Sequence, residues 1–404
     1  MDIEVRTIGD DERVPWLRAT DAAFSSILKD DEIESMLPTI ETNRSFAAMD
    51  EDRIVGTAAA ITTRMAVPGG ARLPTAAVTM VGVHPTHRRR GINTMMMGAL
   101  LDQAADRGEP FAALFASEGA IYGRFGYGLA AYLGEFDAES ARMQFVRGYQ
   151  PRGRIALLSK DEAMPVISSV YDAGLRAGGV ERSDAHTTSR FAAVGEHKDK
   201  SWFYVAHLDD DGTPDAYAAY TMKHEWPRSV PSGKIEVDEC IASTPSGYAA
   251  IWRYLFDVDL VTTVEAWGRP IDEPLFQLVR EPRRLRFGLL DGLWVRLLDV
   301  PAALGARRYA ADGRLVFEVV DRFRPANEGR FELVVEDAAG HCQRTDAEPD
   351  LSGTVNVLGA TYLGGVSFRQ LALASQVDER RDDALAEADA MFASTPAPWC
   401  PWAF

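Results

Sequence analysis

The sequence predicts an α+β protein of three consecutive domains, and three observations lead to this prediction. At 404 residues the chain is too long for one ordinary hydrophobic core. Short apolar strands alternate with helical segments, and the same order recurs in blurred form after about residue 150. A third segment begins near residue 291, where two strands are followed by two helices. The predicted domains are residues 1–150, 151–290 and 291–404.

The composition limits the partners that the protein can have. Hydrophobic residues make up 46% of the chain and charged residues 25%, which is ordinary for a globular protein. The net charge of −17 argues against nucleic acid or an anionic membrane and favours a cationic substrate. No apolar run approaches a membrane span, and the N-terminus lacks a signal-peptide pattern. Because the three cysteines are odd in number and far apart, we expect a cytoplasmic protein without disulfides or a metal.

The first domain begins with elements that alternate between strand and helix. A strand is predicted over residues 2–8, and apolar residues at helical spacing follow over 16–28. Two strands, 46–49 and 54–61, flank a polar turn. The central strand, 78–83, and a further strand, 111–116, enclose a helix that ends at Arg107-Gly108.

The stretch between the central strand and this helix has the pattern of an anion-binding turn. It reads Val-Gly-Val-His-Pro-Thr-His-Arg-Arg-Arg-Gly-Ile-Asn over residues 81–93. Free N–H groups in the first turn of a helix, together with the helix dipole, attract anions. Gly91 lets a ligand approach closely, and Arg88, Arg89 and Arg90 add positive charge. The turn by itself equally allows an exposed basic cap on a surface helix. The helical pattern predicts that one face is buried, formed by Ile92, Met95, Met96, Ala99 and Leu100.

A second motif, Ser117-Glu-Gly-Ala-Ile-Tyr-Gly-Arg-Phe-Gly-Tyr-Gly128, follows the strand at 111–116. Together with Arg88-x-x-Gly91 it resembles the GNAT N-acetyltransferases, and the fuller pattern is similar to the actinobacterial Eis family. The generic GNAT loop has Gly or Ala where this chain has Asn93. The resemblance implies two GNAT-like acetyltransferase domains followed by a sterol-carrier-protein-like α/β domain. It also implies acetyl-CoA as co-substrate.

In the second domain, strands are predicted at 217–222, 234–242 and 261–267, with a helix at 248–256. The turn before this helix is Ser-Thr-Pro-Ser-Gly over 243–247 and has no arginine. A CoA pyrophosphate would lack charge partners there, so this domain is predicted to be GNAT-like without a cofactor. In the third domain, strands are predicted at 315–320 and 331–336 and helices at 371–374 and 384–392. It could bind a sterol or serve for docking and oligomerisation, and we favour docking.

The resemblance assigns acetyl-CoA contacts to the end of the central strand, the basic turn and the end of the next strand. The strand end can supply backbone N–H groups, one of them to the thioester oxygen. The predicted contact residues are Val81, Gly82, Val83, Arg89, Arg90, Gly91, Ile92, Asn93, Thr94, Ser117 and Glu118.

The general acid is predicted to be Tyr122. A phenol with a pKa of ~10 stays protonated at neutral pH and can donate a proton to a thiolate. The sequence alone leaves Tyr127 and Tyr132 equally available, and a core aromatic role for Tyr122 is the alternative. Only the resemblance selects Tyr122.

The chain ends Pro-Trp-Cys-Pro-Trp-Ala-Phe404, which is too apolar and too rich in proline for a disordered tail. We therefore expect the tail to be docked. The resemblance implies that the α-carboxylate of Phe404 is the catalytic base, whereas a simple packing anchor is the alternative.

The leading hypothesis is an acetyl-CoA-dependent N-acetyltransferase that acts on amines of polycationic small molecules such as aminoglycosides. A protein or peptide lysine acetyltransferase is the runner-up, and a non-catalytic lipid-binding protein is the alternative from another class. The resemblance further implies a homo-oligomer, namely a hexamer.

Overall fold

The computed structural model describes residues 3–146, 150, 152–192 and 201–404, so Asp2 and residue 151 lie outside it. The chain divides into two compact units. The first unit comprises Met1–Tyr132, Arg176–Val180 and Asp291–Phe404, and the second comprises Leu133–Leu175 and Glu181–Leu290. The first and third of the predicted segments therefore share one unit. Within the described ranges, no helix is long and apolar enough to cross a membrane.

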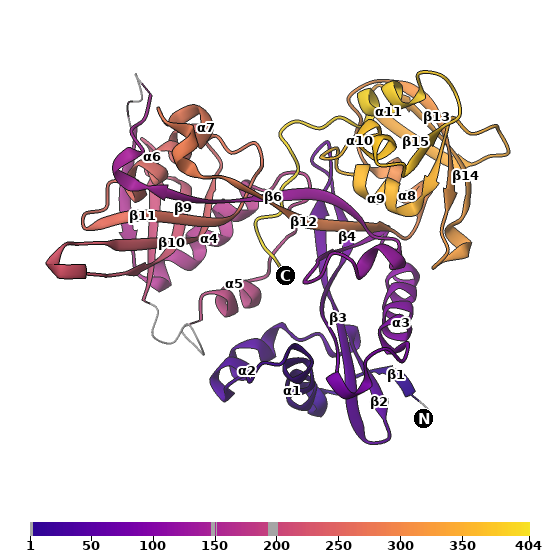
Figure 1. The fold of residues 1–404 in the computed structure, drawn as a ribbon, viewed down its shortest axis with the longest axis horizontal. Coiled ribbons are helices and arrows are strands. Elements are labelled where there is room, and N and C mark those ends of the chain that lie inside the picture. The colour runs from indigo at the N-terminus through magenta and orange to yellow at the C-terminus, as the bar shows by residue number, and fades with distance from the viewer. Residues whose placement is uncertain (1–2, 147–149, 151, 193–200) are drawn as a thin grey trace. The chain divides into compact units, whose positions relative to one another are not determined.

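The N-terminal part of the first unit is a mixed sheet with helices on both faces. Its strands follow the order β1-β2-β3-β4-β5-β12. They are β1 (Ile3–Thr7), β2 (Ser45–Asp50), β3 (Arg53–Ala66), β4 (Arg72–Val83), β5 (Phe111–Phe115) and β12 (Gly288–Leu297). The helices are α1 (Arg13–Phe24), α2 (Asp30–Met36) and α3 (Ile92–Asp106). Figure 1 shows α1 and α3 on opposite sides of β3.

Alternating side chains of β2 explain this two-sided arrangement. Phe46 and Ala48 are buried in the core that contains Met96 of α3. Ala47 and Met49, the intervening residues, are buried in the core that contains the α1 helix. Because successive side chains of a strand point to opposite faces, one strand serves two separate cores. Both faces of the sheet are thereby buried.

The strands β4 and β5 part from each other before β4 ends. They pair in parallel from Thr75–Phe111 to Val78–Leu114, whereas β4 continues to Val83. Met80 has a φ of 52°, and the register between β3 and β4 shifts beside it. This bulge redirects the last residues of β4. We call the place where β4 and β5 are no longer paired the opening. It lies directly before the loop that leads into α3.

The second unit repeats this order of elements. Its strands follow the order β6-β11-β10-β9-β8-β7, and β10 and β11 form a parallel pair. The strands are β6 (Gly128–Glu139), which begins in the first unit, β7 (Arg154–Leu158), β8 (Trp202–Leu208), β9 (Pro214–Lys223), β10 (Gly233–Ala242) and β11 (Val261–Arg269). The helices are α4 (Lys160–Ala173), α5 (Asp184–Arg190), α6 (Pro245–Phe256) and α7 (Leu275–Leu278). Trp252 of α6 is fully buried at the centre of its core.

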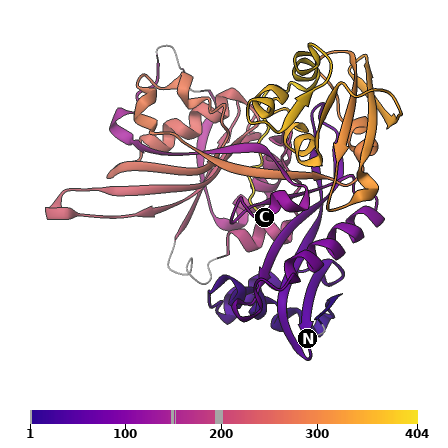
Figure 2. The ribbon, with the colours of Figure 1, turned by 45° about the vertical axis from the view of Figure 1, so that its right-hand side comes forward.

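The C-terminal part of the first unit has its own five-stranded sheet, ordered β15-β14-β13-β16-β17. Its strands are β13 (Gly313–Val320), β14 (Gly329–Glu336), β15 (Ala339–Arg344), β16 (Leu351–Thr354) and β17 (Val377–Glu379). The helices are α8 (Val300–Ala306), α9 (Val355–Thr361), α10 (Phe368–Leu373) and α11 (Ala384–Phe392). Figure 2 shows this part in orange and yellow. We call it the C-terminal domain below.

The predicted buried face of α3 is confirmed at Ile92, Met96 and Leu100, but it is wrong at Met95. Met95, which was expected inside, is 44% exposed, whereas Met97 and Leu101 are fully buried. The reason is that α3 is covered by more than its own sheet. Asp102 forms an ion pair with Arg324 of the C-terminal domain, and Phe323 packs against the same core. A second neighbour widens the buried stripe, and periodicity alone cannot show this.

A buried ion pair joins the start of β2 to the connection between α3 and β5. Arg44 is fully buried and Glu109 is 4% exposed. Both Arg44 terminal nitrogens bond to Glu109 carboxylate oxygens, at 2.5 and 2.9 Å. The geometry is bidentate, so each charge satisfies the other.

We expect Glu109→Ala to destabilise the first unit by about 3–5 kcal/mol, because it leaves the Arg44 charge buried without its partner. Urea unfolding followed by tryptophan fluorescence measures the change. The double variant Arg44→Met/Glu109→Leu is the control and should recover most of the loss. A midpoint for Glu109→Ala equal to that of the parent protein would contradict the prediction.

Candidate active site

The N-terminus of α3 is open for an anion. Gly91 precedes the helix with a φ of 80°, and no side chain caps the first turn. A Cβ built on Gly91 would meet no atom within 4 Å, so a ligand can approach the backbone there. Ile92 is buried and anchors the helix, whereas Thr94 is exposed and Asn93 is half-buried. The first-turn N–H groups therefore fit a pyrophosphate.

The three arginines of the turn have different surroundings. Arg88 donates hydrogen bonds to the carbonyl oxygens of Ala23 (2.9 Å) and Val83 (3.3 Å). This fastens the turn to the end of α1. Arg89 and Arg90 are exposed, and among the described residues the Arg89 guanidinium has no hydrogen-bond or ion-pair partner. Arg89 therefore has the surroundings of a phosphate ligand, whereas Arg90 already makes an interaction of its own.

The two histidines beside the turn make contacts within the loop. His87 Nε2 lies 3.0 Å from an Asp50 carboxylate oxygen. His84 Nδ1 lies 2.7 Å from the Thr86 hydroxyl, and its Nε2 lies 2.9 Å from Arg53. Burial and the neighbouring Arg53 lower the pKa of His84. Both rings hold the loop in place.

The end of β4 forms one wall of the opening described above. Its residues Val81, Gly82 and Val83 are half-buried, and β3 pairs with Gly82 and Val83 on one edge. The opposite edge has left β5 after Val78, so its N–H groups face the opening. A Cβ on Gly82 would lie 2.7 Å from the Ala23 Cβ, so α1 requires glycine there. Ser117 and Glu118 are exposed just after β5, at the other wall.

Tyr122 opens a short 3-10 helix, η5 (Tyr122–Phe125). The ring is 5% exposed and lies against Tyr127, with centroids 5.9 Å apart. Burial raises the pKa of Tyr122, which keeps the phenol protonated. Among the described residues, its hydroxyl has no hydrogen-bond partner. The phenol is therefore not tied to the backbone.

The other two candidate tyrosines differ in accessibility. Tyr127 is 1% exposed, and its hydroxyl is buried with no partner in the described part of the chain. Burial raises its pKa beyond the usual range of a phenol. Tyr132 is half-buried on β6. Burial of the Tyr127 hydroxyl favours Tyr122 over Tyr127 as a proton donor.

The C-terminal tail is docked, as the composition predicts. The Trp399 N–H donates to the Ala177 carbonyl at 2.8 Å, and Trp402 is 5% exposed. The Phe404 ring packs edge-on against Phe115, with centroids 5.3 Å apart. Phe115 is the last residue of β5, so the tail ends at the wall that precedes Ser117. Sequence reasoning missed Phe115, because no local pattern links this strand residue to the C-terminus.

The corresponding turn of the second unit is closed by its own side chains. The Thr244 hydroxyl accepts a hydrogen bond from the Gly247 N–H at 3.0 Å and donates one to the Asp215 carboxylate. Past the last β10–β11 pair, buried Arg269 donates to the Cys240 carbonyl at 2.8 Å. A capped helix beside a carboxylate does not suit a phosphate. At this turn the helix N-terminus is therefore capped, and the lack of a cofactor in this unit stays a prediction.

Two further features bear on the alternative functions. A cavity of about 10 Å³ lies between β13, β16 and α9 of the C-terminal domain, lined by residues that include Phe317, Leu351 and Phe368. This space holds roughly one water molecule and no sterol. In the described ranges, no group of three or more histidine, cysteine or acidic side chains is arranged to hold a metal ion.

Comparison with protein families defines the class of the protein. Residues 4–130 and 178–297 match two models that are each described as an acetyltransferase (GNAT) domain. Residues 300–401 match a model described as a sterol carrier protein domain. The predicted α+β fold of two GNAT domains and a sterol-carrier-like domain is confirmed. The protein is an N-acetyltransferase of the GNAT type, a class that uses an acyl-CoA co-substrate.

The relatives define the family within this class. An uncharacterized N-acetyltransferase of Streptomyces avermitilis is 39% identical over 412 residues, covering both chains completely. The N-acetyltransferase Eis of Mycobacterium tuberculosis is 34% identical over 352 residues, which is 84% of this chain and 83% of that one. The crystal structure of Eis1 from Mycobacterium abscessus superposes with a TM-score of 0.87 at 33% identity, covering 99% of this chain and 100% of the other. The chain belongs to the Eis family of N-acetyltransferases.

The contrast between the two helix N-termini predicts one CoA per chain. Calorimetric titration of the full chain with CoA should give a stoichiometry of one, because of these two helices α3 begins without a side-chain cap and α6 is capped by Thr244. Gly91→Val should remove this binding, since a β-branched residue strains a positive φ and fills the approach to the backbone. Thr244→Val is the matched control and should leave the titration unchanged. Two sites per chain would contradict the prediction.

Proposed function

We propose that the protein transfers the acetyl group of acetyl-CoA to amines of polycationic small molecules such as aminoglycosides. In this proposal Tyr122 is the general acid and the α-carboxylate of Phe404 is the general base. The observation that carries it is the contact between Phe404 and Phe115, with ring centroids 5.3 Å apart. This contact brings the C-terminus to the strand after which Ser117 and the Tyr122 turn follow. The residues invoked therefore belong to one unit of the protein.

The chain supplies the proton transfers that the reaction needs. Acetyl-CoA contributes the acetyl group as a thioester. The Phe404 carboxylate would receive, through water, the proton that an ammonium group loses before it can attack. Backbone N–H groups at the end of β4 would stabilise the negative charge that develops on the carbonyl oxygen. Tyr122 would give its proton to the sulfur as the C–S bond breaks and the C–N bond forms.

The charge near α1 supports a cationic acceptor. The helix α2 follows α1 directly and carries Asp30, Asp31, Glu32 and Glu34. The end of α1 touches β4 at Gly82, so these carboxylates follow the helix that borders the opening. Phe24, the last residue of α1, and Ile27, which precedes α2, are 51% and 89% exposed. Carboxylates beside apolar side chains suit an amine on a ring or alkyl scaffold.

The acceptor class is tested by measuring CoA release with three sets of amines: aminoglycosides, polyamines and lysine peptides. We expect the highest kcat/KM for aminoglycosides with several amines. A preference for lysine peptides would replace the small-molecule proposal by the runner-up function. Retained lipid together with no turnover would favour the lipid-binding alternative. We further propose that the protein is a cytoplasmic homo-hexamer, where the hexamer is what the resemblance to Eis implies. Light scattering of the purified protein tests the hexamer, and cell fractionation tests the location.

Tyr122→Phe should lower kcat by about 100- to 10,000-fold and leave the KM for acetyl-CoA nearly unchanged, because only leaving-group protonation is lost. Burial raises the pKa of Tyr122. The acid form is the protonated one, so the parent enzyme should show no alkaline loss of activity below pH ~10. Steady-state kinetics from pH 6 to 9.5 measure both effects. Near-normal turnover of Tyr122→Phe would assign the acid to Tyr132 or water.

A C-terminal extension should abolish acetyl transfer, because it converts the Phe404 carboxylate to an amide and moves the charge away. Deletion of Phe404 should do the same and also removes the ring that packs on Phe115. Both proteins should still bind CoA with a stoichiometry of one. An equally long N-terminal extension is the control. Full activity of the C-terminally extended protein on its best amine would refute the carboxylate assignment.

A further inference from the structure

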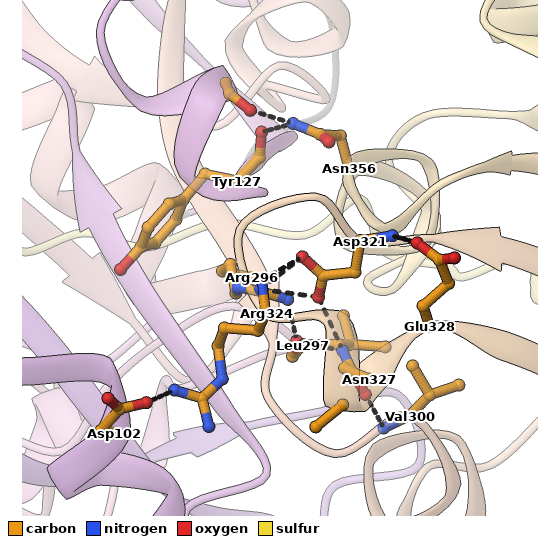
Figure 3. A network of polar contacts seen from close by, with 12 residues as sticks. Asp102, Tyr127, Arg296, Leu297, Val300, Asp321, Arg324, Asn327, Glu328 and Asn356 are labelled. Carbon is orange, nitrogen blue, oxygen red and sulfur yellow. Dashed lines mark hydrogen bonds and ion pairs between the residues drawn. The ribbon is translucent and has the colours of Figure 1, made fainter. Parts of the chain in front are cut away.

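One side chain of the C-terminal domain contacts the turn that carries Tyr122. Asn356 lies on α9, and its Nδ2 donates hydrogen bonds to the carbonyl oxygens of Gly123 (2.7 Å) and Tyr127 (2.8 Å). Figure 3 shows the Asn356 amide nitrogen with dashed lines to two carbonyl oxygens, one of them that of Tyr127. A primary amide has two N–H donors, so both bonds can form at once. The two carbonyls lie on either side of the sharp bend at Gly126.

The turn has few bonds of its own. It is a single 3-10 turn that ends at Gly126, whose φ is 90°. Its closing bonds run from the Gly126 N–H to the Gly123 carbonyl (3.1 Å) and from the Tyr127 N–H to the Tyr122 carbonyl (3.4 Å). Short 3-10 turns have poor hydrogen-bond geometry and leave carbonyls unsatisfied at the C-terminal end. Asn356 gives the Gly123 carbonyl a second donor, and it gives a donor to the Tyr127 carbonyl, which accepts neither of the closing bonds.

Close packing holds the amide in register with the turn. A Cβ on Gly128 would lie 2.0 Å from the Asn356 carbonyl oxygen and 2.5 Å from the Ala360 nitrogen. A Cβ on Gly126 would lie 2.9 Å from Val355 Cγ1. The backbone of α9 therefore touches the strand that leaves the turn, and both glycines are required for this approach.

A buried network supports the other side of the bend. Arg296 is fully buried, and its guanidinium carbon would lie 3.0 Å from a Cβ on Gly126. Its Nη2 bonds to both carboxylate oxygens of Asp321, at 2.7 and 2.9 Å. The Asn327 amide donates to the same carboxylate at 3.2 Å (Figure 3). The bend is thus held between a fixed guanidinium and the Asn356 amide.

We infer that Asn356 is a positioning residue for acetyl transfer: by bonding both carbonyls around the bend, it fixes where the Tyr122 hydroxyl lies. The inference rests on the proposed role of Tyr122 as general acid. A misplacement of about 1 Å in a catalytic group can lower the rate 100-fold. Asn356 therefore influences the rate of acetyl transfer through these two hydrogen bonds, although its side chain does not contact a substrate.

The variants Asn356→Asp and Asn356→Ala test this inference. Asn356→Asp keeps the shape, removes both donors and sets carboxylate oxygens against carbonyl oxygens. We expect kcat to fall about 10- to 100-fold in each, while the KM for acetyl-CoA changes less than about twofold. The matched control is Gln343→Ala, which removes an exposed amide on β15 that donates only to Glu332. It should have the parent kcat.

Rates are divided by the number of CoA sites found by titration, so that a loss of folded protein is not counted as a loss of positioning. Asn356→Ser, a smaller hydroxyl donor that can make one bond, should give an intermediate kcat if the hydrogen bonds matter. Parent kcat per CoA site in Asn356→Ala would overturn the inference. A rise in the KM for acetyl-CoA as large as the expected fall in kcat, with kcat itself unchanged, would also overturn the inference.

A double-mutant cycle separates this inference from the proposed function. If Asn356 acts through Tyr122, Asn356→Ala should lower kcat less than about twofold in the Tyr122→Phe background. Losses that multiply would show that Asn356 acts elsewhere, while the acid role of Tyr122 stands. Near-normal kcat in Tyr122→Phe alone would instead reject the acid role, and with it the premise of the inference.

Discussion

The separation of β4 from β5 is the constraint on which the candidate active site depends. The two strands share only four residue pairs before the bulge at Met80 turns β4 away. Past Val78 the N–H groups on this edge of β4 no longer have β5 as a partner, so they can bond to another group. The separation also places the end of β4, which no longer pairs with β5, directly before the turn that leads to α3. The anion site and the strand end follow from one local departure from regular pairing.

The second unit has a similar separation of two parallel strands, but side chains of the unit itself form hydrogen bonds there. Its parallel strands β10 and β11 also separate, after Val237 and Ala266. There the buried guanidinium of Arg269 bonds to the Cys240 carbonyl, and Thr244 caps the following helix. The backbone pattern is similar, yet the Cys240 carbonyl and the first-turn N–H of Gly247 already have side-chain partners. A fold match alone therefore does not define an active domain, because the state of the backbone N–H groups decides whether a ligand is needed.

The sequence predicts most of the elements and part of the site, for reasons that are physical. Helix α3 is bounded by Gly91 and by Arg107-Gly108, which are local signals, so its limits follow from the sequence. Its buried face does not, since the contacts of Phe323 and Arg324 come from distant parts of the chain. The strand β12 looks from sequence like the opening of the third segment, yet it pairs with β5. Strand patterns reveal a buried face and not the identity of the neighbouring strand.

Long-range contacts of this kind also explain the parts of the site that sequence could not show. The tail is apolar enough to predict docking, but its contact with Phe115 joins residues that are far apart in the sequence. The role of Asn356 is also hidden in the sequence. An asparagine near the start of a helix gives no signal by itself, because the carbonyls that it bonds lie in a distant segment.

These two contacts together give a physical reason for the C-terminal domain to be part of an acetyltransferase. One contact brings a carboxylate to the strand end beside the anion site, and the other bonds the turn that carries the candidate acid. The cavity between β13, β16 and α9 has room for roughly one water, so this domain has little space there for a lipid. Its surface contacts with the Tyr122 turn, rather than its interior, are what a catalytic role requires. A domain shaped like a lipid carrier can thus serve a neighbouring candidate active site through the half-buried amide of Asn356 and through its last residue.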